Sequence, residues 1–161
     1  MPPSDQFHIH VFDVQDKGET WSSCMEGEGL EGTFTDLCIK DSQTMILIRN
    51  GAVPLRTKDG GKTWQPLTAA SRLFSAGAHA IVSGSYSWSG HTLVLHGKDL
   101  SAPARGEYAG FVWRSFDDGD SFTDETGGIV TMAVNQGVWH GADFYLTTSG
   151  EGILAKRGFD Q

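Results

Sequence analysis

The sequence predicts an all-β protein built from a repeating unit of about four antiparallel strands. One observation is an eight-residue frame, Ser/Thr-x-Asp-x-Gly-x-Thr/Ser-Trp/Phe, which occurs at residues 14–21, 57–64 and 115–122 with Val14 as its only departure. A second is the lack of any long apolar run with helical spacing in a chain that carries 21 glycines. The third is the spacing of the frame aspartates, which lie 43 and 58 residues apart. A frame that recurs at such intervals is typical of repeat proteins.

The frame has the chemistry of a turn between two strands. Its Asp carboxylate can accept hydrogen bonds from the backbone N–H groups that follow it. The Gly two residues later takes a positive φ without steric cost. The Thr or Ser restarts an extended strand, and the aromatic residue enters the apolar layer below. We therefore expect a structural role for the frame residues, which are Asp16, Gly18, Thr20, Trp21, Asp59, Gly61, Thr63, Trp64, Asp117, Gly119, Ser121 and Phe122.

Apolar runs between the frames align as three successive strands of each unit. The expected first strands are 35–39, 80–83 and 135–139, the second strands are 45–48, 92–95 and 144–147, and the third strands are 53–56, 111–114 and 153–156. The second strands are almost continuously apolar, which indicates that both of their faces are covered. Residues 7–12 resemble a further third strand that leads into the first frame.

The longer second interval has a visible source. Residues 97–110 are rich in Gly, Ala, Ser and charged residues, and we interpret them as a loop-like insert. Without that insert the period is close to 43 residues, the length of a four-stranded propeller blade. One further period after Asp117 reaches Asp160, where a fourth frame would begin.

The frame resembles the Asp-box, or bacterial neuraminidase repeat, of sialidases, sortilin-type receptors, photosystem assembly factors and some xyloglucan hydrolases. This resemblance implies a single β-propeller domain over residues 1–161 with about four blades, in which each box joins the third and fourth strands on the face away from the ligand site. The ring could be closed within the chain or completed by self-association, or the chain could be part of a longer propeller. The same box occurs in enzymes, receptors and scaffolds, so it does not fix an activity.

The resemblance to sialidases implies three arginines that bind the carboxylate of the substrate. It also implies a Tyr–Glu pair that acts as the nucleophile and an Asp that acts as the acid. Arg49, Arg72 and Arg105 are the candidates, with Glu107 and Tyr108 near the last of them. The Arg-Ile-Pro signature of sialidases is missing, and the chain is less than half as long as their typical catalytic domain. We therefore keep a sialidase-like glycoside hydrolase as the alternative and expect no catalytic residues.

The favoured interpretation is a non-catalytic binding or assembly module that recognises a protein or a glycan. The expected contact residues are Arg49, Arg72, Arg105, Glu107, Tyr108 and Trp88. Trp88 lies in the sequence Tyr-Ser-Trp-Ser-Gly, which is typical of a turn. Core packing is the alternative role for Trp88, because aromatic residues of repeat proteins commonly fill the gaps between units. A structural subunit of a virus particle, which would be a homo-oligomer, is a further alternative.

Charge and composition narrow the partners. A net charge of −8 disfavours nucleic acid and favours a protein or a neutral or cationic glycan. We expect a soluble chain, because it has neither a signal-peptide start nor an apolar stretch of about 18 residues. We expect no cofactor and no metal, since His8 and His10 share a strand face but lack a third local ligand. Cys38 is expected to be a small buried apolar residue, with a Cys24–Cys38 disulfide as the alternative in an exported protein.

Overall fold

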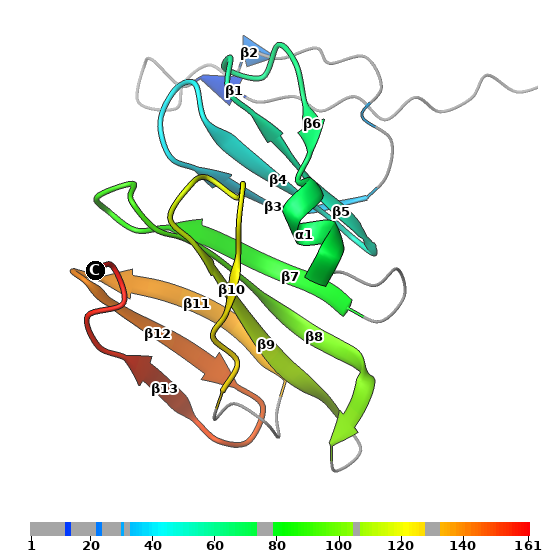
Figure 1. Cartoon of the computed structure of the whole chain (residues 1–161), viewed down its shortest axis with the longest axis vertical. Coiled ribbons are helices and arrows are strands. Elements are labelled where there is room, and N and C mark those ends of the chain that lie inside the picture. Colours follow the sequence, from blue (N-terminus) through cyan, green and yellow to red (C-terminus); the bar gives the residue numbers. More distant parts are fainter. Residues whose placement is uncertain are drawn as a thin grey trace, which may run out of the picture.

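The computed structural model describes residues 12–13, 22–23, 30, 33–73, 79–104, 107–127 and 133–161. This part of the chain is all-β apart from one short helix, α1 (Thr68–Leu73) (Figure 1). No helix within these residues is long and apolar enough to cross a membrane. The all-β prediction is confirmed.

Three antiparallel sheets follow one another along the chain, and each places its strands in sequence order. The first contains β3 (Phe34–Ile39), β4 (Met45–Arg49), β5 (Ala52–Thr57) and β6 (Gln65–Pro66). The second contains β7 (His79–Tyr86), β8 (Leu93–Ala104), β9 (Glu107–Ser115) and β10 (Thr123–Asp124). The third contains β11 (Val134–His140), β12 (Asp143–Thr148) and β13 (Ile153–Lys156). A two-stranded pair, β1 (Phe12–Asp13) and β2 (Ser22–Ser23), flanks the first frame.

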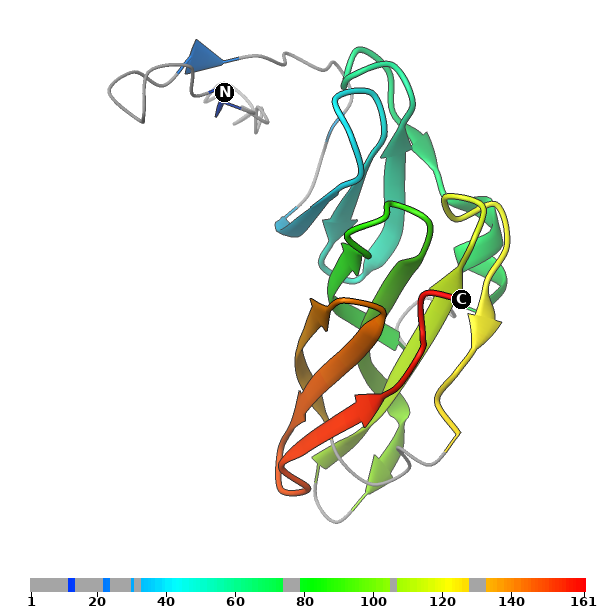
Figure 2. The ribbon, with the colours of Figure 1, turned by 90° about the vertical axis from the view of Figure 1, so that its left-hand side faces the viewer.

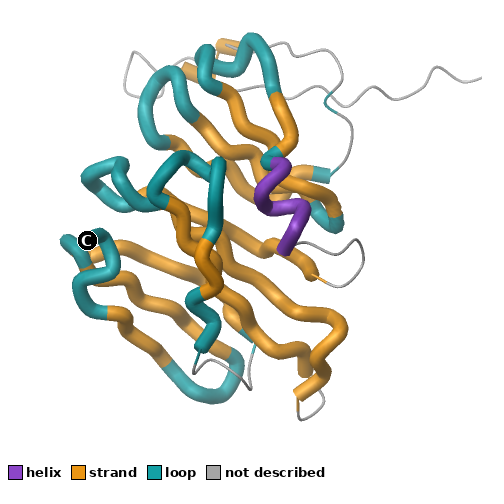
Figure 3. The backbone as a smooth tube through the Cα atoms, viewed as in Figure 1, coloured by secondary structure: helices purple, strands orange, loops and turns teal. Residues whose placement is uncertain are grey.

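The three sheets stand side by side in an open arc (Figures 1 and 2). Their first strands are neighbours, because β7 packs against β3 on one side and against β11 on the other. Turns gather at the two ends of the strands (Figure 3). Within the described residues the sheets do not close into a ring. The structure shows three of the blade-like units that the sequence predicts, and the number of blades remains a prediction.

The hydrophobic core lies between the sheets. One cluster joins the first and second sheets and includes Cys38, Ile46, Ile48 and Trp113. A second cluster joins the second and third sheets through side chains such as Phe144. Strand β4 and residues 93–97 of β8 are buried on both faces, as their continuous apolar sequences predicted. The third of these strands, β12, differs from the prediction, because its buried side chains, Phe144 and Leu146, lie on one face. Cys38 is a free thiol that is only 3% exposed, which agrees with its expected role as a small buried apolar residue.

Residues 97–110 are not the loop that the sequence indicated. Strand β8 continues to Ala104 and β9 begins at Glu107, so the segment is the far part of one long hairpin with an irregularity between Asp99 and Pro103. The glycine that begins the segment, Gly97, is needed for packing rather than for a loop. A Cβ at this position would lie 2.0 Å from the carbonyl oxygen of Ala80 on β7. The small residue is required by close strand approach rather than by a flexible loop.

Two local features complete the fold. Helix α1 lies in the link between β6 and β7 and places Ala70 fully buried in the first cluster. Of the strand expected at residues 7–12, only Phe12 falls within the described residues, where it pairs with Ser23.

Candidate functional site

Residues 57–64 and 115–122, the second and third copies of the frame, form a turn in the first and second sheets, and we call each of them a box turn. The box turn of the first sheet is held by one carboxylate. Asp59 Oδ1 accepts hydrogen bonds from the Thr63 backbone N–H at 2.9 Å and from the Thr57 hydroxyl at 2.7 Å. Asp59 Oδ2 accepts the Thr63 hydroxyl at 2.6 Å. The Thr63 hydroxyl and backbone, together with Thr57, lower the pKa of Asp59 to about 2, because each donates to its ionised form. Gly61 takes φ +90° and donates its N–H to the Thr57 hydroxyl at 2.8 Å.

The box turn of the second sheet repeats this geometry. Asp117 accepts from the Ser121 backbone N–H at 2.8 Å, from the Ser121 hydroxyl at 2.6 Å and from the Ser115 hydroxyl at 2.8 Å. Gly119 takes φ +87° and donates to the Ser115 hydroxyl at 2.8 Å. The Ser or Thr that opens the frame is therefore as much a part of the turn as the Asp.

The aromatic residue of each turn is half-buried. Trp64 donates its indole N–H to the Gly61 carbonyl at 3.1 Å and packs against the cluster that contains Leu47 and Leu55. Phe122 packs against the core between the first and second sheets. The corresponding residues of the first frame, which are Asp16, Gly18, Thr20 and Trp21, lie outside the described residues.

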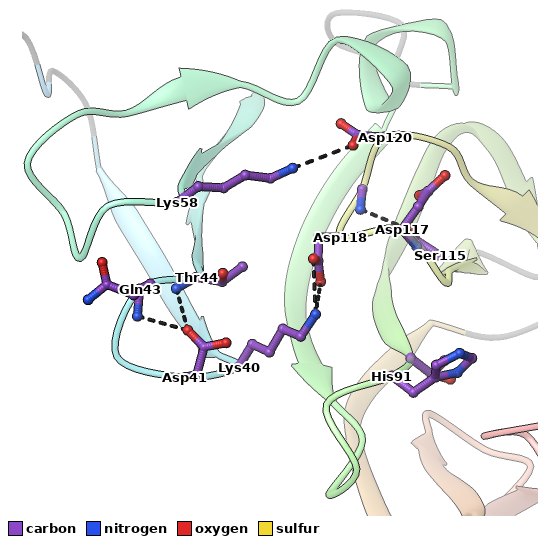
Figure 4. Close-up of polar contacts among 12 residues, drawn as sticks. Lys40, Asp41, Gln43, Thr44, Lys58, His91, Ser115, Asp117, Asp118 and Asp120 are labelled. Atoms are coloured by element: carbon purple, nitrogen blue, oxygen red, sulfur yellow. Dashed lines mark hydrogen bonds and ion pairs between the residues drawn. The ribbon is translucent and has the colours of Figure 1, made fainter.

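An arginine three residues before the box Asp connects the first sheet to the turn of the second. Arg56 Nη1 donates to the Asp118 carbonyl at 2.7 Å, and Nη2 pairs with Asp120 at 2.7 Å. Lys40 pairs with the Asp118 carboxylate at 2.8 Å and Lys58 with Asp120 at 3.6 Å (Figure 4). Asp118 has a φ of +56°, which is uncommon for a residue other than Gly, and these contacts from the first sheet hold it there.

Arg114 occupies the same place in the second sheet. It donates to the Phe159 carbonyl of the third sheet's last turn at 3.3 Å and pairs with Glu125 at 2.5 Å. Lys156 of the third sheet pairs with the same Glu125 at 3.1 Å, so this junction is also bridged by charge. Arg56 and Arg114 thus both bind the following sheet from the box end of their own sheet.

Of the three arginines that a sialidase would need, the structure describes the side chain of Arg49 alone. Arg49 lies at the end of the sheet away from the boxes, where its Nε and Nη2 donate to the Val53 carbonyl at 3.1 and 2.7 Å. Arg105 and the side chains of Arg72, Glu107 and Tyr108 lie outside what the structure describes. The backbones of Glu107 and Tyr108 pair with Ala104 and Pro103 near the tip of the long hairpin.

Trp88 is separated from those residues. It lies in the turn between β7 and β8, at the box end of the second sheet, and its side chain is 76% exposed. Hydrogen bonds fix this turn from within: the Ser87 N–H donates to the Thr92 carbonyl at 2.8 Å, and the Gly90 N–H donates to the Ser87 carbonyl at 2.8 Å. The Ser89 hydroxyl donates to Asp160 of the third sheet's last turn at 2.7 Å.

Three further rings lie in turns or at strand ends on this side of the molecule. The indole of Trp88 meets His140 edge-on with the ring centres 6.4 Å apart. His91, which lies in the same turn as Trp88, contacts Phe116, which is 43% exposed, with the ring centres 5.3 Å apart. We call Trp88, His91, Phe116 and His140 the aromatic patch. The sequence analysis did not identify His91, Phe116 and His140. These residues are far apart in the sequence, and only the structure shows that they all lie at the box end of the sheets.

One titratable group is buried without a partner. His96 on β8 is 0% exposed, and neither ring nitrogen has a hydrogen-bond partner in the described part of the chain. Burial lowers the pKa of His96 to about 4, against a smaller opposing effect of Asp36. Within the described residues no three His, Cys, Asp or Glu side chains are placed to hold a metal ion.

Comparison with known proteins bears on the fold. No protein-family model matches the sequence, and no curated protein matches it. Among solved structures, YCF48 from Cyanidioschyzon merolae aligns with a TM-score of 0.58 and 20% identity over 82% of this chain. A structure of YCF48 bound to D1 peptide aligns with a TM-score of 0.38 and 14% identity over 92% of this chain and 57% of that chain, too distant to bear on the site.

This chain spans 39% of the length of the C. merolae protein. YCF48 is a β-propeller protein, and its likeness extends over the successive antiparallel sheets described above. The chain therefore has a β-propeller fold.

Proposed function

We propose that this chain is a non-catalytic binding module that recognises a protein or glycan partner through the aromatic patch. The observation that carries the proposal is the exposure of Trp88 on a turn that is already ordered by hydrogen bonds. A flat indole offers a large stacking surface, and a fixed turn loses little conformational entropy when a partner binds. Exposed, rigid aromatic residues of this kind commonly contribute most of the binding energy of an interface.

The surroundings of the patch indicate the chemistry of its partner. The carboxylate of Asp160 lies beside the turn, whereas Asp118 and Asp120 of the neighbouring box turn are paired with cations of the first sheet. The chain as a whole carries a charge of −8. These charges favour a neutral or cationic partner, either a sugar ring that stacks on the indole or an apolar side chain flanked by Lys or Arg.

The far end of the β8–β9 pair, where the backbones of Glu107 and Tyr108 pair with Ala104 and Pro103, is a second candidate contact surface at the opposite end of the second sheet. Arg105, which follows Ala104 in the sequence, remains a candidate from the sequence. A glycosidase function has less support, because Arg49 is already bound to the carbonyl of its own hairpin. We therefore propose binding without catalysis.

The test is binding of the full chain to an immobilised glycan library and to a peptide library that samples neutral and cationic sequences. We expect a specific ligand in one library, and a loss of at least about tenfold in affinity for Trp88→Ala. Ile153→Ala is the matched control, since it removes another side chain that is 71% exposed but lies on the third sheet. Unchanged binding by Trp88→Ala, or no ligand in either library, would show that the patch is not a binding site.

A further inference from the structure

The turn between β4 and β5 places an asparagine directly before a glycine. Asn50 and Gly51 form the two-residue connection between Arg49 and Ala52, which pair across the hairpin. Both turn residues are exposed. Gly51 has a φ of +66°, and nothing lies within 4 Å of a Cβ built on it. The peptide nitrogen of Gly51 is therefore open to the approach of a neighbouring side chain.

Two neighbouring polar groups of this turn are not engaged elsewhere. The Asn50 backbone N–H donates to the Thr33 carbonyl at 2.8 Å. Neither the Asn50 side-chain amide nor the Gly51 N–H has a hydrogen-bond partner within the residues that the structure describes. Both are strong hydrogen-bonding groups, which a partner would otherwise hold in place. A free peptide nitrogen next to a free asparagine amide is the arrangement from which the two close into a five-membered imide ring.

The other asparagine of the chain lies in a different setting. The sequence contains two asparagines, Asn50 and Asn135, and both are exposed. Asn135 Nδ2 donates to the Ser149 hydroxyl at 3.1 Å, so this amide is held by a hydrogen bond. The residue after it is Gln136, whose side chain shields the peptide nitrogen that a glycine leaves open. The free amide and the unshielded nitrogen are therefore particular to Asn50.

We propose that Asn50 is a site of spontaneous deamidation in the folded chain, with water as the only co-reactant. In the first step the Gly51 nitrogen forms a bond to Asn50 Cγ, while the bond from Cγ to the side-chain nitrogen breaks. The proton lost by the Gly51 nitrogen ends on the leaving group, which departs as ammonia. Water then opens the imide at either of its two carbonyl carbons and leaves a carboxylate at residue 50. No electrons are gained or lost, and the reaction is independent of the proposed function of the aromatic patch.

The hairpin is held on the strand side of the turn, so the reaction does not require the chain to unfold. Arg49 Nε and Nη2 donate to the Val53 carbonyl at 3.1 and 2.7 Å, which closes the hairpin next to the turn. Ile48, which precedes Arg49, is fully buried and anchors β4 in the first cluster. Exposed turns outside such anchored strands rearrange locally without global unfolding.

The product differs from the original chain in charge and in the turn itself. Asn50 is neutral, whereas a carboxylate at residue 50 adds negative charge to a chain whose net charge is already −8. The new charge directly follows Arg49, so it lowers the positive potential at the end of the first sheet away from the boxes. Opening of the imide at its backbone carbonyl also routes the main chain through the side chain of residue 50.

The test is a peptide map by mass spectrometry of the full chain after incubation at mildly alkaline pH in water labelled with heavy oxygen. We expect residue 50 to exchange its amide for an acid group that carries labelled oxygen, while Asn135 stays unchanged. The reaction should run within about tenfold of its rate in a free peptide of residues 46–54, because the turn is already open to solvent. If the reaction needed global unfolding, it would be slower than in the peptide by about a thousandfold or more.

Two matched variants locate the reaction, and both change exposed side chains only. Asn50→Gln should abolish the mass change, because glutamine would have to close a larger and less favourable ring. Asn135→Gln is the control and should react at residue 50 as the wild type does. A reaction at residue 50 that is more than about tenfold slower than in the peptide would overturn the proposal. So would a mass change that persists in Asn50→Gln, or an Asn135 that reacts as fast as Asn50.

Discussion

At the junction between the first and second sheets, β4 contributes Ile46 and Ile48, both fully buried. At the junction between the second and third sheets, the matching positions on β8 hold Val94 and His96, which are equally buried. Both junctions carry an arginine that reaches the next turn, and both sheets end in a box turn with the same hydrogen bonds. The turns and the arginines are therefore common to both junctions, whereas the buried side chains between the sheets differ from one junction to the other. The difference gives the second junction a buried histidine at a position where the first has an isoleucine, so protonation of His96 opposes folding there.

The largest expected effect concerns the apolar junction. Ile48→Ala removes a fully buried side chain from the first cluster and leaves a cavity, so it should lower the free energy of unfolding by about 2–5 kcal/mol. Ile39→Ala, at a side chain that is 57% exposed on β3, is the control and should change it little. Denaturant titration measures both, and similar values for the two variants would contradict the described core.

The second effect tests the acid sensitivity of the other junction. The pKa of His96 falls from an ordinary value of 6.5 to about 4 in the folded chain because of burial. Between pH 6.5 and 4 the unfolded chain binds a proton that the folded chain does not, so the free energy of unfolding should fall as the pH falls, by up to about 3 kcal/mol.

His96→Ile places the residue of the first junction in the second and should remove this part of the pH dependence. His91→Gln changes an exposed histidine and should leave it unchanged. Denaturant titrations at several pH values between 4 and 7 measure the slope. A slope that is the same in His96→Ile and wild type would show that His96 is not the group responsible.

A third effect compares the glycine at each junction. A Cβ on Gly84 would lie 2.6 Å from Leu95 Cδ2 and 2.9 Å from both the Val94 carbonyl and Cys38 Sγ, while a Cβ on Gly137 would lie 2.4 Å from Phe144 and 2.9 Å from His96. Alanine at either position should cost about 1–3 kcal/mol through overpacking. Gly127→Ala is the control, because nothing lies within 4 Å of its Cβ. Thermal melts should show two destabilised variants beside an unchanged control.

The smallest effect compares the arginines. Arg56→Ala removes a charged donor to the Asp118 carbonyl and the partner of Asp120, and it should cost about 1–2 kcal/mol of stability. Arg157→Ala should leave the stability of the single chain almost unchanged, because Arg157 is largely exposed and contacts only its own sheet. Chemical denaturation at a concentration where the chain is a monomer separates the two, and an equal loss for both would mean that the arginines do not differ in role.

Much of the fold could be predicted from the sequence, because its signals are local. The apolar runs at 45–48 and 92–95 predicted buried second strands, and residues 45–49 and 93–104 form them. The phase of the repeat also predicted which strands begin and end together. The prediction of a loop at residues 97–110 was wrong. A glycine such as Gly97 occurs both in flexible loops and where two strands approach closely, and the sequence does not distinguish the two.

The candidate site was less predictable, since it depends on contacts between sheets. The sequence singles out Trp88 but not the contacts that place His140 beside it and Phe116 beside His91. His96 stood among scattered histidines, and only the packing of the third sheet against β8 gives it a depressed pKa. Arg157 became informative once Arg56 and Arg114 were seen to bind the following sheet.

The box turns also affect the chemical stability of two aspartates in this protein. The sequence has two Asp-Gly steps, Asp59-Gly60 and Asp118-Gly119, and such steps rearrange to isoaspartate when the glycine nitrogen attacks the preceding carboxyl group. In both turns that nitrogen is engaged: Gly60 donates to the Gln43 carbonyl at 3.0 Å and Gly119 to the Ser115 hydroxyl at 2.8 Å. The folded chain should therefore resist this rearrangement at two positions where an unfolded one would be vulnerable.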